Sequence, residues 1–181
     1  MNHRYFNSKA MPPLNHAWAG KVLGMQVRPY PSRGIDLFDE KKGVELKFKV
    51  LYSDKEVYKS WRILENEMTY GENGNTAYWG LAFYTLSKLV NRLKPRDIRI
   101  LESLVLNREL YLVEWSWMYQ FPVHIEEGVR KTGKPYRNFL RFAKFSELPR
   151  TTDTISVKGG IVNITEGVQT SSFRIKKKQE S

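Results

Sequence analysis

Three ionisable side chains lie close together in the sequence, on a segment whose pattern predicts two neighbouring strands. Asp36 lies in a short apolar run, and Glu45 and Lys47 follow it on a stretch in which apolar and polar residues alternate. If the two strands pair, both carboxylates and the ammonium group meet at one edge of a sheet. Such a set can hold a hard divalent cation and place a water molecule beside it, which is the chemistry of a metal-dependent hydrolase.

The elements that must position these groups are predicted from periodicity and turn residues. The alternation of residues 44–50 is typical of a strand with one apolar face, and residues 35–38 form a second short strand-like run. The charged link 39–43 ends in Gly43, as a turn between paired strands does. The alternative is a half-exposed hairpin with a cross-strand ion pair, which contributes less than about 1 kcal/mol.

The order Gly34, Asp36, a turn and then Val44-Glu45-Leu46-Lys47 resembles the core of the PD-(D/E)XK nucleases, the superfamily of restriction endonucleases and archaeal Holliday junction resolvases. It is most similar to the smallest type II restriction enzymes. A looser similarity continues through an aromatic segment, a Leu-x-Pro-x-Asp-Ile junction at residues 93–98 and a Trp-rich segment. Ile35 replaces the proline of the motif, and no acidic residue precedes Asp36 to supply the upstream glutamate of many relatives.

The resemblance implies an α/β (α+β mixed) fold with a restriction-endonuclease-like central mixed β-sheet flanked by helices. It also implies a Mg²⁺-dependent endonuclease acting on double-stranded DNA, with Mn²⁺ as a substitute ion. Asp36, Glu45 and the carbonyl of Leu46 are the implied metal ligands, and Lys47 is implied to orient or help deprotonate the attacking water. A homodimer is expected by analogy, because cutting both strands needs two such sites. A Holliday junction resolvase or a DNA repair nuclease stays open, as does a non-catalytic basic nucleic-acid-binding protein.

Charge and composition favour a polyanionic partner. Thirty Lys and Arg against nineteen Asp and Glu leave a net charge of +11 over 181 residues, which points to nucleic acid. No cysteine is present, so disulfides and thiolate sites are excluded and a cytoplasmic (intracellular) location is expected. The most apolar run, residues 77–86, is too short to span a membrane. We expect a single nuclease-like domain over residues 1–170 and a basic flexible tail over residues 171–181.

Two candidate DNA contacts precede the motif. Residues 1–35 contain no acidic residue, and Arg28 and Arg33 are candidate phosphate contacts in the loop before Asp36. The alternative is an ordinary basic helix and loop. A helix is predicted over residues 14–25, opened by two prolines. His16 lies on it, but a structural role is favoured because no histidine lies near the motif in the sequence.

Further candidate DNA contacts come later in the chain. Asn73 and Asn75, in the predicted loop 71–75, are side chains that can read adenine, although a solvated turn gives the same pattern. Residues 128–145 are predicted to be a helix on which Lys134, Arg137, Arg141 and Lys144 form one cationic stripe. A solvated face is the alternative, and the stripe would split if this segment were a strand.

The remaining pattern predicts a helix over residues 57–68, with Glu65 and Glu67 facing outward or completing the metal site. Residues 78–84 are predicted to be a central strand, followed by helices over 86–93 and 95–105. A strand is predicted over residues 109–121, whose aromatic face is expected to be core or a subunit interface and could alternatively stack bases. Residues 155–164 are predicted to form a hairpin around two glycines.

Overall fold

The computed structural model describes residues 10–31, 33–51, 60–72, 75–87 and 95–178. Its core is a mixed seven-stranded sheet in the order β1-β2-β3-β5-β6-β10-β9, and a second sheet has the order β4-β8-β7. The strands of the large sheet are β1 (Gln26–Val27), β2 (Leu37–Phe38), β3 (Lys42–Val50), β5 (Thr76–Leu86), β6 (Val105–Glu114), β9 (Thr151–Val157) and β10 (Gly160–Thr165). The small sheet holds β4 (Ser60–Leu64), β7 (His124–Val129) and β8 (Pro135–Lys144).

Helical structure is limited in the described part of the chain. The one α-helix with several turns is α2 (Met11–Leu23), which opens on Pro12 and Pro13 and ends at Gly24 in the left-handed conformation. The other helical segments are the 3₁₀ turns η3 (Glu65–Glu72), η5 (Pro95–Leu104), η6 (Trp115–Gln120), η7 (Phe145–Glu147) and η8 (Thr170–Ser172). No helix among these described elements is long and apolar enough to cross a membrane.

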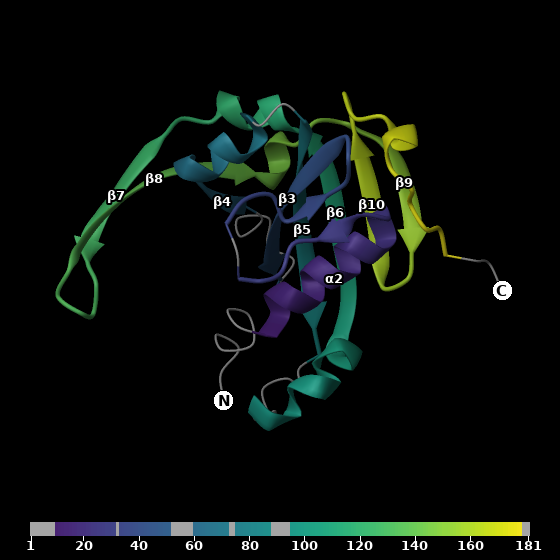
Figure 1. Ribbon diagram of the computed structural model, residues 1–181, viewed down its shortest axis with the longest axis horizontal. Coiled ribbons are helices and arrows are strands. Elements are labelled where there is room, and N and C mark those ends of the chain that lie inside the picture. The colour runs from purple at the N-terminus through teal and green to yellow at the C-terminus, as the bar shows by residue number, and fades with distance from the viewer. Residues whose placement is uncertain (1–9, 32, 52–59, 73–74, 88–94, 179–181) are drawn as a thin grey trace.

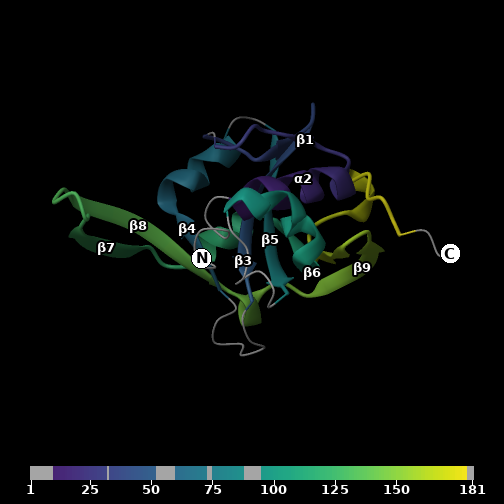
Figure 2. The ribbon, with the colours of Figure 1, turned by 90° about the horizontal axis from the view of Figure 1, so that it is seen from below.

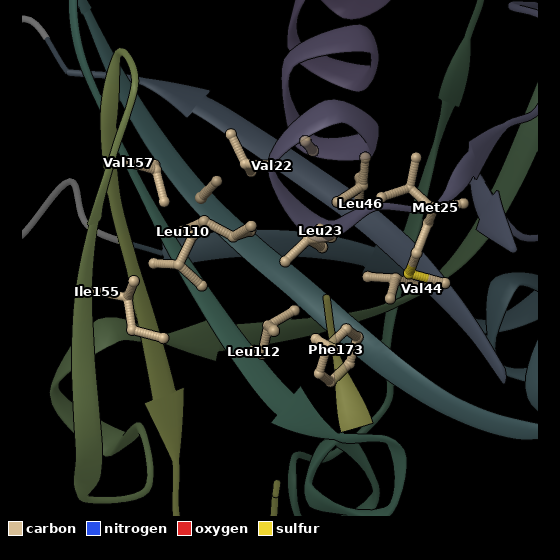
Figure 3. Packing of buried hydrophobic residues seen from close by; sticks show 14 of the residues in the cluster. Val22, Leu23, Met25, Val44, Leu46, Leu110, Leu112, Ile155, Val157 and Phe173 are labelled. Carbon is tan, nitrogen blue, oxygen red and sulfur yellow. The ribbon is translucent and has the colours of Figure 1, made fainter. Parts of the chain in front are cut away.

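The large sheet is covered differently on its two faces. On one face, α2 packs its Val22 and Leu23 against Val44, Leu46 and residues from five other strands (Figure 3). On the opposite face, β4 and the turns η6 and η7 cover a second cluster that is rich in aromatic residues. The expectation of a mixed central sheet is therefore confirmed, but much of the covering layer on the second face is a small sheet and 3₁₀ turns.

The central strand β5 shows why the two faces differ. Trp79, Leu81 and Phe83 point into the aromatic cluster, whereas Gly80 and Ala82 face the side of α2. A Cβ on Gly80 would lie 2.6 Å from a methyl group of Leu46, so only glycine allows that close approach. β5 pairs with β3 in parallel and with β6 antiparallel, so both of its edges are hydrogen-bonded.

The hairpin that carries the motif forms as predicted. β2 and β3 are antiparallel, with Leu37 opposite Val44, and the Asp39 carboxylate accepts the N–H groups of Lys41 and Lys42 at 2.8 and 2.9 Å. The helix predicted over residues 14–25 is α2, the strand over 78–84 is β5, and the hairpin over 155–164 is β9 and β10. The helix predicted over 95–105 is the 3₁₀ segment η5, and most of that predicted over 86–93 lies outside the described residues.

Two segments differ from the helices predicted for them. Residues 60–64 form β4, in which Trp61 and Ile63 are buried while Arg62 between them is exposed, and the acidic turn η3 follows. Residues 135–144 form β8, which pairs with β4 on one side and β7 on the other. In both segments the apolar spacing also fits a helix, and the cross-strand partner, far away in the sequence, decides in favour of strand.

The aromatic strand predicted over residues 109–121 is shorter than expected. β6 ends at Glu114, and Trp115 begins a 3₁₀ turn in which its ring stacks on Trp79 at 4.1 Å between centroids. Tyr111 and Val113 face the aromatic cluster, and Leu110 and Leu112 face α2. The aromatic side chains Tyr111 and Trp115 are therefore core residues.

The prediction of a basic flexible tail over residues 171–181 is also corrected, because residues 171–178 are not a flexible tail. Phe173 is buried among the residues under α2 (Figure 3), and its ring meets Tyr78 edge-on at 5.2 Å. The backbone N–H groups of Lys176 and Lys178 donate to the carbonyls of Val22 and Ser156, at 3.0 and 2.9 Å. This segment is therefore part of the folded core.

Candidate active site

A cleft of about 660 Å³ opens between α2, β3, β4 and η3. Its floor is the polar face of β3, because Glu45, Lys47 and Lys49 all point into it. The small sheet supplies one wall through β4 and β8, and α2 supplies the opposite one. Further lining residues from these walls are Asn15, His16, Asp36, Ser60, Arg62, Glu67, Tyr70 and Phe142.

Lys47 joins two acidic side chains inside the cleft. Its ammonium nitrogen Nζ donates to Glu45 Oε1 at 3.0 Å and to Glu67 Oε1 at 2.7 Å. The other oxygen of Glu67 accepts the backbone N–H of Leu64 at 2.9 Å, which fixes the carboxylate at the start of η3. The ammonium group therefore has a defined position between two carboxylates.

Asp36, the residue immediately before β2, also lies in this cleft. Continuing the β2–β3 register by one pair places it opposite Glu45. Its Oδ2 accepts the backbone N–H of Leu46 at 2.8 Å, and its Oδ1 lies 3.6 Å from Nδ1 of His16 on α2. The predicted convergence of Asp36, Glu45 and Lys47 is thus present in the structure.

The environment of the cleft disfavours the charged forms of both Asp36 and Glu45. Glu45 is only 3% exposed, and burial, together with the nearby Asp36 carboxylate, raises its pKa to about 8 even though Lys47 opposes the shift. Burial also raises the pKa of Asp36, against the opposing effect of His16. Burial lowers the pKa of His16. The pKa of Lys47 is raised because Glu45 and Glu67 together outweigh its desolvation.

These groups fit a divalent cation on chemical grounds. Glu45 Oε2 is buried and has no hydrogen-bond partner, so one carboxylate oxygen is held out of water without compensation. Leu46 directs its N–H toward Asp36, and in an extended strand the carbonyl of the same residue points to the same edge. Within the described part of the chain, no group of three or more acidic or histidine side chains could hold an ion by itself. The ligands that fit a divalent cation are therefore the carboxylates of Asp36 and Glu45 and the carbonyl of Leu46.

The candidate DNA contacts near the motif are placed in different ways. Arg28 uses its Nε to donate to the Ile35 carbonyl at 2.7 Å and lies over the ring of Phe38, so it braces the loop before Asp36. Arg33 is exposed in that loop. Asn75 is exposed beside β5 and lines a small neighbouring pocket, and Asn73 lies outside the described residues.

The cationic stripe predicted on a helix is wrong, because β8 divides it between two faces. Arg137 and Arg141 lie on one face of the strand, Lys144 lies on the other, and Lys134 lies in the turn before the strand. Arg141 donates to both oxygens of Glu65, at 2.7 and 2.9 Å, and to the carbonyl of Phe121. Arg141 is therefore a structural side chain.

Sequence reasoning did not place His16 near the motif and offered Glu67 only as an alternative. His16 is 20 positions before Asp36, and Glu67 is 20 positions after Lys47. Neither separation follows a local periodicity, so only the packing of α2 and η3 on β3 brings these side chains into the cleft. The sequence signal for Glu67 was that it is acidic and follows the strand that carries Lys47. Glu65, which was predicted together with Glu67, binds Arg141 instead.

Comparisons of the chain with protein-family models, with curated proteins and with solved structures find no significant match in any of the three.

Proposed function

We propose that this protein is a Mg²⁺-dependent endonuclease that hydrolyses phosphodiester bonds in double-stranded DNA, with Mn²⁺ able to replace Mg²⁺. The observation that carries the proposal is the meeting of Asp36, Glu45 and Lys47 in one open cleft, where a buried oxygen of Glu45 has no partner. The net charge of the protein, +11, supports a polyanionic substrate. The proposal includes an intracellular location and a homodimer, in which two clefts serve the two strands of the duplex.

Asp36 and Glu45 would hold the metal ion, with the carbonyl of Leu46 as a neutral ligand. A bound divalent ion would supply a more acidic water and stabilisation of the charge that develops on the phosphate. The two carboxylates already approach each other across the hairpin, and each is positioned by neighbouring groups: Asp36 by the Leu46 N–H and Glu45 by Lys47. A bound cation would take the place of the proton that Glu45 keeps below about pH 8, and its charge would offset the desolvation of both acids.

Lys47 is suited to a role beside the scissile phosphate. Its ammonium group stays protonated, since Glu45 and Glu67 both raise its pKa, so it acts as a fixed donor and not as a base. From its position between those acids it can orient a water molecule and place positive charge next to a phosphoryl oxygen. Glu67 would then act as a positioning residue that holds Lys47.

The fold supports the same proposal at the level of elements. The strand that carries Glu45 and Lys47 is β3, which pairs in parallel with the central strand β5 of the mixed sheet. The hairpin β2–β3 brings Asp36 opposite Glu45, and this placement supports the proposal.

The test is Mg²⁺-dependent cleavage of supercoiled, linear and four-way-junction DNA by wild type and by Glu45→Gln. We expect wild type to cut duplex DNA and Glu45→Gln to lose at least about 100-fold in rate, because the variant removes a metal-binding oxygen while keeping the shape of the side chain. Glu40→Gln is the matched control: Glu40 is exposed in the turn before β3, so its rate should stay within about twofold.

Lys47→Ala separates catalysis from binding. It is expected to retain DNA binding in the absence of metal while losing cleavage. No cleavage of any of the three DNA forms by wild type, with either Mg²⁺ or Mn²⁺, would overturn the enzyme proposal and leave a basic nucleic-acid-binding protein. Cleavage of the four-way junction alone would replace duplex DNA with branched DNA as the substrate.

A further inference from the structure

A two-stranded ribbon projects from the body of the protein in both views (Figures 1 and 2). It consists of β7, the turn 130–134 and the first half of β8, and we call residues 124–139 the arm. The turn is closed by two backbone hydrogen bonds, from Arg130 N–H to the Lys134 carbonyl and from Gly133 N–H to the Arg130 carbonyl, each 2.8 Å. Gly133 has a φ of 80°, which the turn requires.

The arm begins at the wall of the candidate active site. β8 pairs with β4 along five residues, and Phe142 of β8 and Ser60 and Arg62 of β4 line the cleft. The bidentate contact between Arg141 and Glu65 anchors this base to η3, next to Glu67. A ligand that leaves the cleft on this side would therefore run along the arm.

Charge is distributed unevenly along the arm. In its shaft the two acids are engaged: Glu126 contacts Arg62 and Asn138, and Glu127 pairs with Arg137 at 2.8 Å. At the tip, Arg130, Lys131 and Lys134 are exposed, and the structure shows none of the described carboxylates in an ion pair with them. The arm is therefore nearly neutral along its shaft and strongly cationic at its tip, which is the charge that complements a row of phosphates.

The length of the arm sets how far from the cleft it can reach. From Phe142 at the cleft to Pro135 at the turn is seven residues, or roughly 23 Å at about 3.3 Å per residue. A duplex rises about 3.4 Å per base pair, so the tip lies roughly seven base pairs from a phosphate held in the cleft. A two-stranded ribbon also has the width that a major groove of about 12 Å admits.

The exposed apolar residues of the arm lie on one face, where Ile125 is opposite Phe139 and Val129 is opposite Pro135. Such a face also occurs where proteins associate. Self-association through the outer strand β7 would bring Glu126 and Glu127 of two copies together, and like charges on paired strands are unfavourable. The acids of β7 therefore disfavour pairing with a second copy of the chain, and the cationic tip favours a polyanion.

We propose that the arm is a duplex-binding element, whose tip holds backbone phosphates about seven base pairs away from the bond in the cleft. This inference rests on the proposed function, since the partner is the same double-stranded DNA. It adds a second contact region, remote from Asp36, Glu45 and Lys47, that makes binding depend on duplex length.

The test compares a tip variant with a matched charge control. The tip variant is Arg130→Ser with Lys131→Ser and Lys134→Ser. The control is Lys176→Ser with Lys177→Ser and Lys178→Ser, which removes the same charge from exposed positions at the end of the described chain, on the opposite side of the molecule from the arm (Figures 1 and 2). Binding is measured by fluorescence anisotropy without divalent metal, over a series of salt concentrations, on a short duplex of about 5 base pairs closed by a hairpin loop and on a duplex of about 30 base pairs.

For the longer duplex, the tip variant should lower the slope of log affinity against log salt by about 2 to 3, since each lost phosphate contact removes about 0.9. Its affinity should fall by at least about tenfold, while the short duplex, which cannot reach the tip, should bind equally to both proteins. The control should leave the slope for the longer duplex within about one of wild type. Slopes that are equal in wild type and tip variant, or an equal loss in the control, would overturn the proposal.

The outcome does not depend on cleavage, so the two proposals fail separately. Tip-dependent binding by a protein that never cuts DNA would support the arm proposal and overturn the nuclease. If the protein cuts DNA and the slope of log affinity against log salt is the same in wild type and tip variant, the nuclease proposal is supported and the arm proposal is overturned. Wild type that binds no duplex, or a tip variant that changes only the mass of the protein in light scattering, would overturn the arm proposal.

Discussion

Glu45 combines deep burial with an incomplete set of partners. Its Oε1 accepts a hydrogen bond from the Lys47 ammonium group, and its Oε2 has no hydrogen-bond partner in the folded protein. A buried polar atom without a partner costs roughly 1–3 kcal/mol, and more when it carries charge. A bound cation would supply the missing partner of this oxygen, as the proposed metal site requires.

Stability should depend on pH through Glu45. Its pKa is raised from 4.5 to about 8 in the folded protein, so between those values the folded chain keeps a proton that the unfolded chain has released. The unfolded state then binds fewer protons, and the free energy of unfolding falls as pH rises. Urea denaturation of wild type should show a loss of roughly 1 kcal/mol between about pH 7 and about pH 8.

Glu45→Gln is the control for this effect, because it cannot titrate. Its free energy of unfolding should be flatter over the same interval, which lies above the range in which His16 titrates with its lowered pKa. Saturating Mg²⁺ should stabilise wild type at about pH 8 and leave Glu45→Gln unchanged, since a ligand stabilises only the state that binds it. An equal pH slope in both proteins would contradict the assignment of the raised pKa to Glu45.

At the scale of elements, a partly buried cation joins the small sheet to the turn η3. Arg141 of β8 makes a two-point contact with Glu65 and also donates to the carbonyls of Tyr119 and Phe121. These acceptors come from η3 and from the end of η6, so a single guanidinium group links three segments. The side chain therefore fixes the base of the arm relative to the cleft.

A double-mutant cycle of Arg141→Ala and Glu65→Ala should give a coupling energy of about 1–2 kcal/mol, measured by urea denaturation. Arg141→Ala alone should cost more than Glu65→Ala, because two carbonyls lose their donor as well. The matched pair is Arg137 and Glu127, which are 58% and 62% exposed and should couple by less than about 0.5 kcal/mol. Equal coupling in the two cycles would show that Arg141 is an ordinary surface charge.

At the scale of the whole molecule, the two ends of the described chain close the same face of the large sheet. α2 lies near the start and residues 171–178 near the end: Phe173 packs in one cluster with Val44 and Leu23 and meets Tyr78 edge-on (Figure 3), and Lys177 pairs with Val157 of β9. Residues 171–178 are therefore part of the fold. A basic composition in this segment does not make it a free tail, because Phe173 and Ile175 alternate with the cations.

Phe173→Ala should lower the free energy of unfolding by about 3–5 kcal/mol, since the ring is only 6% exposed and its removal leaves a cavity. Val129→Ala, at a position that is 69% exposed on the arm, should change it by no more than about 0.5 kcal/mol. Both are measured by urea denaturation at one pH. A change below about 1 kcal/mol in Phe173→Ala would mean that the final segment is not part of the core.

The sequence by itself determined the features that depend on neighbours in the chain. The alternation along residues 44–50 indicated a strand with Glu45 and Lys47 on one face, and the turn before it placed Asp36 opposite. The glycines after residue 158 indicated a hairpin. These features follow from the two-residue period of strands and from local turn chemistry, which act within about ten residues.

Only the tertiary structure decided the features that depend on distant partners. Residues 60–64 and 135–144 have apolar spacings that suit a helix, and they become strands because each supplies the other with hydrogen bonds across about 80 positions. His16 and Glu67 enter the cleft because α2 and η3 pack beside β3. Burial then removes water from Glu45 and sets its raised pKa, a property of the packed cleft that no stretch of sequence carries alone.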